Sequence, residues 1–171
     1  SRRIGSKFNP ETDMTKLAVN GKEFEVEIKP HESLADVLRN QLDLIGVRVS
    51  CNEGECGSCT VIMDGKPVTA CIVLGMQAEG KEILTIEGLG TVDNLHPIQQ
   101  AYIEEQGFQC AFCTPGFILA TKAFLDENPD PTAEEAAIGI SGNICRCGAY
   151  PYIVQSVLSA ARKLREQETT E

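Results

Sequence analysis

Residues 51–59 read Cys51-Asn-Glu-Gly-Glu-Cys56-Gly-Ser-Cys59, and the rest of the chain can be understood outward from this run. Together with Cys71 it gives a first set of four cysteines, spaced C-x4-C-x2-C-x11-C. The remaining cysteines form a second set, spaced C-x2-C-x31-C-x1-C: Cys110, Cys113, Cys145 and Cys147. Short spacings of this kind are typical of metal ligands, whereas disulfides belong mainly to secreted proteins, and we recognise no signal peptide. The sequence therefore predicts two metal centres.

The spacing of the first set indicates which kind of centre it forms. Its first three cysteines match the plant-type C-x4-C-x2-C pattern, in which four thiolates hold a [2Fe–2S] cluster. Gly54 and Gly57 lie within the run and can adopt the positive φ that lets a backbone approach a metal closely. The second set is less specific by spacing alone. Structural zinc, which also takes four cysteines, stays open for it.

The composition argues against several classes of protein. A chain of 171 residues, 42% of them hydrophobic, suits one globular domain or two small ones. No stretch approaches the roughly 20 apolar residues of a membrane span, so we expect a soluble protein. The formal charge of −10 argues against nucleic acid and anionic membranes, which attract clustered Lys and Arg. We expect a cytoplasmic location, with periplasmic export of a folded complex as an open alternative.

The segment over residues 15–88 carries strand signals and one helix signal. Asn20-Gly21 and Asp64-Gly65 each stand between apolar strand residues, which is the strongest local signal for a β-hairpin. Ser33 can cap a helix whose apolar positions follow helical spacing. A last strand is predicted by Ile83, Leu84 and Ile86. We expect a small mixed sheet with one helix across it, preceded by a flexible arm over residues 1–14.

Beyond a predicted linker over residues 88–94, helical signals replace the strand signals. Four helices are expected: over residues 96–106, from Pro115 to about Asp126 with Thr114 as the cap, after the capping box Thr132-Ala-Glu-Glu135, and from Pro151 to Leu164. Facing helices of such a unit, over residues 95–164, can surround a metal site near one end of the bundle. An acidic tail over residues 165–171 is expected to follow.

We expect no catalytic residue on this chain. His96 precedes Pro97 at a helix start, where a capping role is the simplest account, and Ser58 lacks the partners of a nucleophile. Neither a G-x-G-x-x-G nor a P-loop motif is present, so we expect no nucleotide site. Arg146, between two cysteines of the second set, suits either the electrostatic stabilisation of an anionic centre or a structural contact.

Three motifs follow one another along the chain, and together they are highly specific. They are Cys51-x4-Cys56-Gly-x-Cys59, Phe108-Gln-Cys110-x2-Cys113-Thr-Pro-Gly116 and Gly142-Asn-Ile-Cys145-Arg-Cys147-Gly-x-Tyr150. Over residues 15–160 the chain resembles the iron–sulfur subunit of the molybdenum hydroxylases, the family of xanthine oxidase and aldehyde oxidoreductase. This resemblance assigns the second set to a [2Fe–2S] cluster as well.

The resemblance implies an α+β fold with a plant-type ferredoxin-like (β-grasp) N-terminal domain and a C-terminal four-helix bundle, each holding one [2Fe–2S] cluster. The second-set cluster would lie nearer the molybdopterin and the first-set cluster nearer a flavin. Gln109 matches a residue that hydrogen-bonds the pterin, and Cys147 would lie beside the pterin's amino group. The implied partners are a large molybdopterin-binding subunit and a medium FAD-binding subunit. Gly148-Ala149-Tyr150 departs from the commoner Thr-Gly-Tyr, which leaves open whether FAD or another acceptor is used.

We therefore expect the electron-transfer subunit of a molybdenum-containing oxidoreductase. It would relay single electrons between the molybdenum site and a flavin or other acceptor, while substrate chemistry takes place on a partner chain. A free-standing two-cluster ferredoxin is the alternative, and exposed apolar faces on the helical half would argue against it. A zinc-stabilised binding module is a third hypothesis, which predicts a colourless protein.

Overall fold

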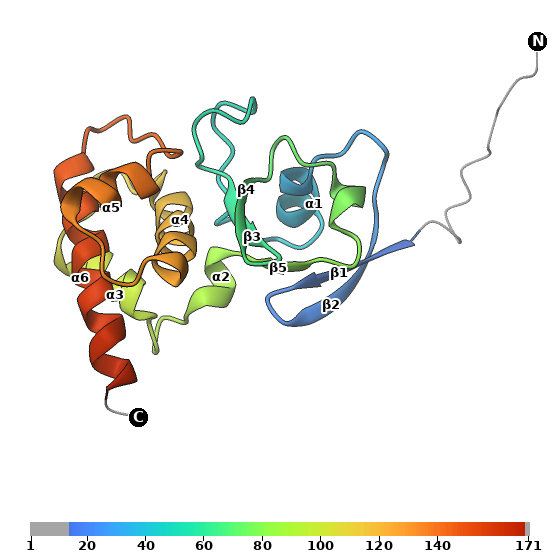
Figure 1. Ribbon diagram of the computed structural model, residues 1–171. Helices are drawn as coiled ribbons and strands as arrows, with labels where there is room; N and C mark the ends of the chain where they lie inside the picture. Colours follow the sequence, from blue (N-terminus) through green and yellow to red (C-terminus); the bar gives the residue numbers. More distant parts are fainter. Residues whose placement is uncertain (1–13, 170–171) are drawn as a thin grey trace, which may run out of the picture.

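The computed structural model describes residues 14–169, which form two lobes that lie side by side (Figure 1). A strand-rich lobe holds the sheet and α1, and a helical lobe holds α3 to α6. The short helix α2 (Ile86–Leu89) lies between them. The predicted arm, residues 1–14, lies outside the described residues except for Met14, which begins β1 (Met14–Val19). The expected α+β class is confirmed.

Two tight hairpins and one parallel pairing build the sheet. β1 pairs antiparallel with β2 (Lys22–Glu27), and β3 (Thr60–Met63) pairs antiparallel with β4 (Lys66–Thr69). β5 (Glu82–Leu84) joins the hairpins, parallel to β1 and antiparallel to β3, so that the strand order is β2-β1-β5-β3-β4. Both hairpin turns have positive φ at their two central residues, as type I′ requires: Asn20 53°, Gly21 72°, Asp64 49° and Gly65 78°. Both predicted hairpins are confirmed.

Helix α1 (Leu34–Asn40) contributes to the core of the strand-rich lobe. The predicted cap is present: Ser33 Oγ accepts a hydrogen bond from the Asp36 N–H, and the Asp36 carboxylate accepts one from the Ser33 N–H, both at 3.1 Å. A 3-10 turn, η1 (Gly75–Ala78), follows Cys71. The core residues without exposed surface include Leu17, Val19, Leu34, Val37, Leu38 and Val61. The first cysteine loop therefore leaves and re-enters one rigid core.

The predicted last strand is shorter than its apolar residues suggested. Ile86 belongs to α2, not to β5, so its assignment to a strand is wrong. The cause lies one residue earlier, where the Thr85 N–H donates to Asn20 Oδ1 (2.8 Å) instead of continuing the ladder. Helix α2 also occupies the first residues of the predicted 88–94 linker.

The helical lobe contains the four expected helices: α3 (Pro97–Glu104), α4 (Thr114–Glu127), α5 (Ala133–Gly139) and α6 (Tyr150–Glu168). Helix α3 packs along α6, and Tyr102, Phe117 and Ile153 fill the space between the helices. The capping box of Thr132 and Glu135 is confirmed. Residues 165–168, expected as part of the tail, continue α6.

Two cap assignments had different outcomes. His96 caps α3, as predicted, because its Nδ1 accepts a hydrogen bond from the Ile98 N–H (3.3 Å). Thr114 is the first residue of α4 rather than its cap, so that prediction is wrong. Cys113 already has a helix-like backbone (φ −83°, ψ −10°) and occupies the cap position, which moves the helix start one residue earlier.

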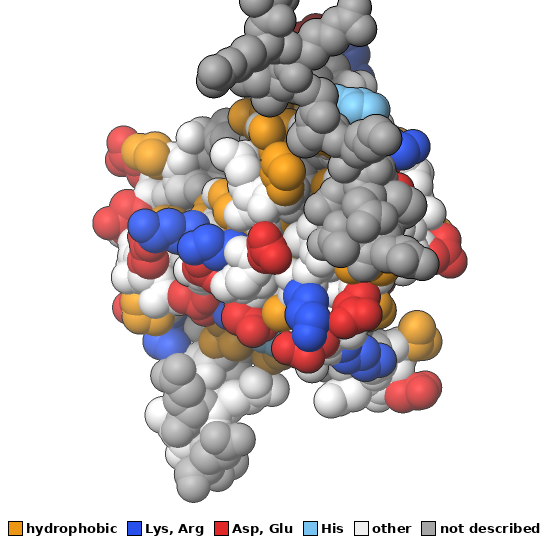
Figure 2. Space-filling model, turned by 90° about the vertical axis from the view of Figure 1, so that its right-hand side faces the viewer, with side chains coloured by type: hydrophobic (Ala, Val, Ile, Leu, Met, Phe, Trp, Pro, Cys, Tyr) orange, Lys and Arg blue, Asp and Glu red, His pale blue; other side chains and the backbone are white. Residues whose placement is uncertain are grey.

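The lobes are joined by an apolar contact rather than a free linker. Ile62 of β3 packs with Leu119 and Ala123 of α4, and Leu84 and Ile86 pack against this cluster. The end of the strand-rich lobe remote from this contact carries interspersed acidic and basic side chains with scattered apolar ones (Figure 2). Within residues 14–169, no helix has both the length and the apolar composition of a membrane span.

The cap of α3 should be sensitive to acid. Burial lowers the pKa of half-buried His96, Lys122 lowers it further and Asp126 acts in the opposite direction. The unfolded chain therefore binds more protons between the lowered pKa and about 6.5, so His96 stabilises the fold fully above that pH and progressively less as pH falls. We predict that His96→Asn, a cap that does not titrate, reduces the acid sensitivity of α3. Hydrogen exchange of the α3 amides between pH 7 and pH 5, corrected for intrinsic rates, measures this; identical pH dependence in both proteins would contradict it.

Candidate iron–sulfur centres

The first cysteine set lies on the loop between α1 and β3 and, for Cys71, on the turn that follows β4. Asn52, Gly54 and Gly57 have positive φ (57°, 82° and 65°), so the two glycines do what the sequence predicted. This conformation turns backbone N–H groups toward sulfur: the Glu53 N–H donates to Cys51 Sγ at 3.4 Å. The N–H groups of Glu53 and Cys56, together with the Cys56 side chain, lower the pKa of Cys51 to about 7. The loop thus favours a thiolate.

Sulfur atoms of the first set approach one another in two pairs. The thiol of Cys56 lies close enough to that of Cys51 to lower its pKa, and the thiol of Cys71 likewise acts on that of Cys59. Cys51 and Cys56 are half-buried, whereas Cys59 and Cys71 are buried. Burial raises the pKa of Cys59 to about 11, so Cys59 needs a nearby positive charge, such as a metal, to become thiolate.

The second set comes from the loops that lead into α4 and α6. Cys110 Sγ and Cys147 Sγ lie 3.5 Å apart, and both residues are exposed. Cys113 and Cys145 form the inner pair, and burial raises the pKa of Cys113 to about 12. The Phe112 N–H lowers the pKa of Cys110 by hydrogen-bonding its sulfur. The second set therefore repeats the arrangement of the first, with one inner and one outer pair.

The donor set fits two-iron clusters. Over residues 14–169, no three Cys, His or acidic side chains surround one point in the manner of ligands to a single ion. A [2Fe–2S] cluster does not need such a point, because its four thiolates divide into two for each iron. Two close sulfur pairs per set are the arrangement that this division requires.

Two unpartnered polar atoms also fit this chemistry. Within the described part of the chain, Arg48 Nε and Thr114 Oγ1 are buried without a hydrogen-bond partner. Arg48 lies three residues before Cys51, and Thr114 directly follows Cys113. Because buried donors are nearly always satisfied, both atoms suit a neighbourhood that also contains acceptor sulfur.

The two cysteine loops are in direct contact. The Ile144 N–H donates to the Cys56 carbonyl at 3.0 Å, which links a residue of the first set to the residue before Cys145. Buried Asn143 donates from Nδ2 to the Gly57 carbonyl at 2.8 Å. A Cβ on Gly57 would lie 2.6 Å from Asn143 Nδ2, so the contact requires glycine there. The two sets thus form one connected unit.

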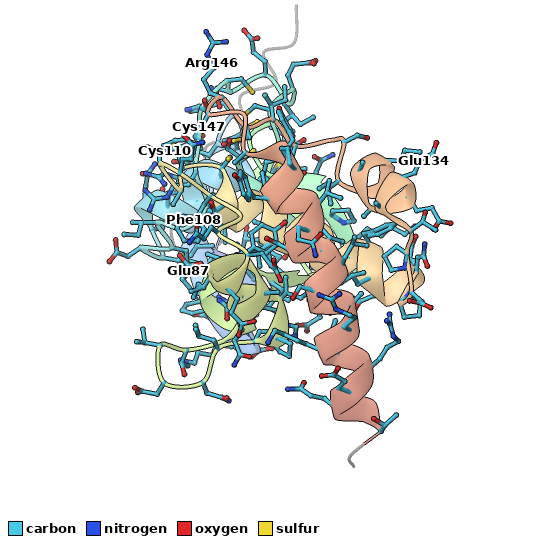
Figure 3. The ribbon with its side chains drawn as sticks, turned by 90° about the vertical axis from the view of Figure 1, so that its left-hand side faces the viewer. Glu87, Phe108, Cys110, Glu134, Arg146 and Cys147 are labelled. Atoms are coloured by element: carbon cyan, nitrogen blue, oxygen red, sulfur yellow. The ribbon has the colours of Figure 1, made fainter. Side chains whose placement is uncertain are left out.

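One end of the second set reaches the surface. Gln109, Cys110 and Cys147 are exposed. Figure 3 shows Cys110, Cys147, Phe108 and Arg146 along the same side of the molecule, away from Glu134. Exposed apolar side chains occur on the segments that carry these cysteines: Phe108, Phe112, Ile144, Tyr150 and Tyr152. The outer sulfur pair is therefore accessible to another molecule.

The structure adds residues that sequence reasoning did not single out. Asn143 was quoted within a motif but received no role, and Arg48 and Phe112 received none. Arg48 places its guanidinium carbon 5.9 Å from the centre of the Phe112 ring. Nothing in the spacing of Arg48 and Phe112, 64 positions apart, indicates this contact. The position of Asn143, two residues before Cys145, is the one sequence feature that could have indicated its role beside the cysteine loops.

Comparison with known proteins agrees with this geometry. Residues 17–85 match the model of the 2Fe-2S iron-sulfur cluster binding domain, and residues 85–158 match that of the [2Fe-2S] binding domain. The chain is 42% identical to the iron-sulfur-binding subunit PaoA of the Escherichia coli aldehyde oxidoreductase, over 91% of this chain and 75% of the relative.

Two solved structures have the same fold. Quinoline 2-oxidoreductase from Pseudomonas putida 86 matches with a TM-score of 0.85 and 36% identity, covering 90% of this chain and 96% of that one. The aldehyde oxidoreductase from Desulfovibrio desulfuricans matches with a TM-score of 0.87 and 46% identity, over 91% of this chain. This chain spans only 17% of that longer polypeptide. From the two domain matches, the extended identity and the shared fold, we conclude that the chain belongs to the family of [2Fe–2S] iron–sulfur small subunits of the molybdenum hydroxylases.

Proposed function

We propose that this chain relays single electrons through two [2Fe–2S] clusters between a molybdenum site on a partner chain and a flavin or other acceptor. The observation that carries the proposal is the hydrogen bond from the Ile144 N–H to the Cys56 carbonyl. The shortest path through the chain from Cys56 of the first set to Cys145 of the second consists of covalent bonds and this single hydrogen bond. Each bound cluster supplies one-electron redox chemistry. The chain's contribution is to hold two such centres adjacent and fixed.

The close sulfur pairs support an assignment of ligands to individual irons. Cys51 and Cys56 would hold the outer iron of the first cluster, and Cys59 and Cys71 the inner one. In the second cluster, Cys110 and Cys147 would hold the outer iron, and Cys113 and Cys145 the inner one. Backbone N–H groups around the outer sulfurs favour added negative charge, because hydrogen bonds to sulfur stabilise the reduced state.

The finer architecture is part of the same proposal. The strand order and the α1 packing support a ferredoxin-like, β-grasp domain over residues 15–88. The packing of α3, α4, α5 and α6 supports a four-helix bundle domain over residues 95–164. The apolar contact of Ile62 with α4 supports fixed placement of the two domains.

The exposed outer pair of the second set supports the direction of the relay. An exposed Cys110 and Cys147, rimmed by apolar side chains, suit a face that meets the large molybdopterin-binding subunit. Gln109 and Cys147 would contact the pterin there. In the relative from D. desulfuricans a matching region forms 17% of one long chain, which supports permanent association with a larger polypeptide. A medium FAD-binding subunit or another acceptor would lie nearer the first set. A location in the cytoplasm is part of the proposal, because its reducing conditions keep the eight thiol ligands unoxidised.

Co-purification tests the assembly. Expressed with its neighbouring chains, the protein should elute with a large molybdenum-containing subunit, and a stoichiometric complex supports the proposal. A cluster-loaded monomer that binds no partner and is fully reducible would instead identify a free-standing two-cluster ferredoxin. Iron and sulfide at about four each per chain are expected, whereas zinc without sulfide would indicate a zinc-stabilised module.

The sets should be separable by mutation. Cys59→Ser should abolish one electron paramagnetic resonance signal and about half of the iron, because Cys59 holds only the first cluster. The matched variant Cys113→Ser should abolish the other signal. Loss of both signals in either variant, with the fold intact by circular dichroism, would contradict two independent sites.

The contact between the loops should be measurable. Asn143→Ala removes the side-chain hydrogen bond that reaches the Gly57 carbonyl from the other loop, while the Thr60 N–H and hydroxyl, from the same loop as Gly57, still donate to that carbonyl. The loss of this one hydrogen bond should cost about 0.5–1.5 kcal/mol of local stability. The Ile144 N–H should then exchange with solvent severalfold faster, and transfer between the clusters should slow. Tyr102→Phe, which removes a buried hydrogen bond to Thr121 (2.9 Å) away from the two loops, is the control and should leave the exchange of the Ile144 N–H unchanged. Unchanged exchange in Asn143→Ala would show that other contacts hold the loops.

A further inference from the structure

Arg48 occupies an unusual position for a cation. It lies on the segment between α1 and Cys51 and is half-buried. The segment directly before it is held by Arg39, whose Nη1 donates to the carbonyls of Val47 (2.6 Å) and Ile45 (3.2 Å). Within the described residues, Arg48 forms no ion pair with a carboxylate, and its Nε is buried without an acceptor. A partly buried cation without an anion is costly, so its position needs an explanation.

The contact of Arg48 leads to the second cysteine set. Its guanidinium carbon lies 5.9 Å from the centre of the Phe112 ring, within the range of a cation–π interaction. Phe112 stands between Cys110 and Cys113, and its N–H hydrogen-bonds the Cys110 sulfur. Arg48 thus lies three residues before the first cysteine set in the chain, while its positively charged guanidinium lies against the loop of the second set.

A bound cluster would supply the anion that Arg48 lacks. A [2Fe–2S] cluster with four thiolates is negatively charged, and reduction adds one more negative charge. A nearby cation stabilises the reduced state more than the oxidised state, and the effect is larger where burial lowers the effective dielectric constant. The charge of Arg48 should thus make a neighbouring cluster easier to reduce.

We propose that Arg48 sets the reduction potential of the second-set cluster, with Phe112 holding its guanidinium against the Cys110–Cys113 loop. The proposal rests on the proposed function, since it requires the second set to hold a cluster. A merely structural Arg48 would instead tie the two loops together without a charge-dependent effect on potential.

The test is a potentiometric titration followed by electron paramagnetic resonance, on the cluster-loaded protein in its complex. Arg48→Met should lower the reduction equilibrium constant of the second-set cluster by on the order of tenfold, which for one electron is 59 mV. Arg48→Lys, which keeps the charge, should recover most of the shift. Phe112→Leu, which keeps the charge but removes the ring, should give a smaller shift in the same direction.

Arg162→Met is the matched control for the loss of one positive charge. Arg162 is exposed on α6, twelve residues after its start, which is about 18 Å along the helix and beyond the Debye length. It should leave the potential of the second-set cluster unchanged. A shift as large as that of Arg48→Met would mean that net charge, not the position of Arg48, is responsible.

Several results would overturn the proposal without touching the proposed function. An unchanged second-set potential in Arg48→Met with full iron content would do so, and so would an equal shift in Arg48→Lys and Arg48→Met. If the Arg48→Met protein loses iron, the titration is repeated with Arg48→Gln. If both variants lose iron, an unshifted second-set potential in Phe112→Leu overturns the proposal. The proposed function fails separately, if the unmodified complex lacks two [2Fe–2S] signals.

Discussion

The contact between the two cysteine loops is the constraint on which the rest of the structure depends. Gly57 lies between Asn143 and Gly116: a Cβ there would meet Asn143, and a Cβ on Gly116 would lie 2.3 Å from the Gly57 carbonyl. Asn143 and Ile144 then hydrogen-bond the Gly57 and Cys56 carbonyls. Because close backbone approach of this kind tolerates no side chain, a small change at either glycine would separate the loops. The position of one cysteine set thereby fixes the position of the other.

The cysteines of each set differ in how readily they ionise. Burial raises the pKa of buried Cys59 and of half-buried Cys113, so these two thiols stay protonated until a metal is present. The outer cysteines Cys51 and Cys110 accept backbone N–H groups, which lower their pKa. Burial also raises the pKa of Cys145, but hydrogen bonds from the Ala149 and Cys147 backbone outweigh it, and the net shift is downward. The inner pair of the second set therefore combines one thiol that resists ionisation, Cys113, with one that favours it.

Groups close to the cysteine sets, rather than the net charge of the chain, dominate the electrostatic potential at the clusters. The chain carries a net charge of −10, which would disfavour a further negative charge on either cluster. Amide donors on the cysteine loops and the cation of Arg48 counter that effect at short range, where screening by salt is weakest. Ion pairs such as Lys81–Asp64 and Arg165–Asp130 lie on the surface and contribute little to this balance.

The sequence by itself determined the local chemistry of this protein. Asn20-Gly21 and Asp64-Gly65 specify their turns because few other residues accept positive φ, and Ser33, His96 and Thr132 specify helix starts through their own hydrogen bonds. The cysteine spacing likewise indicated two four-thiolate sites. Short-range signals failed at two places. Asn20, 65 positions before Thr85 in the chain, ended β5 before Ile86, and the helix-like backbone of Cys113 moved the start of α4 one residue ahead of the predicted one. Only the tertiary structure decided the sulfur pairs, the Asn143–Gly57 contact and the Arg48–Phe112 contact, because each joins residues whose separation along the chain carries no periodic signal.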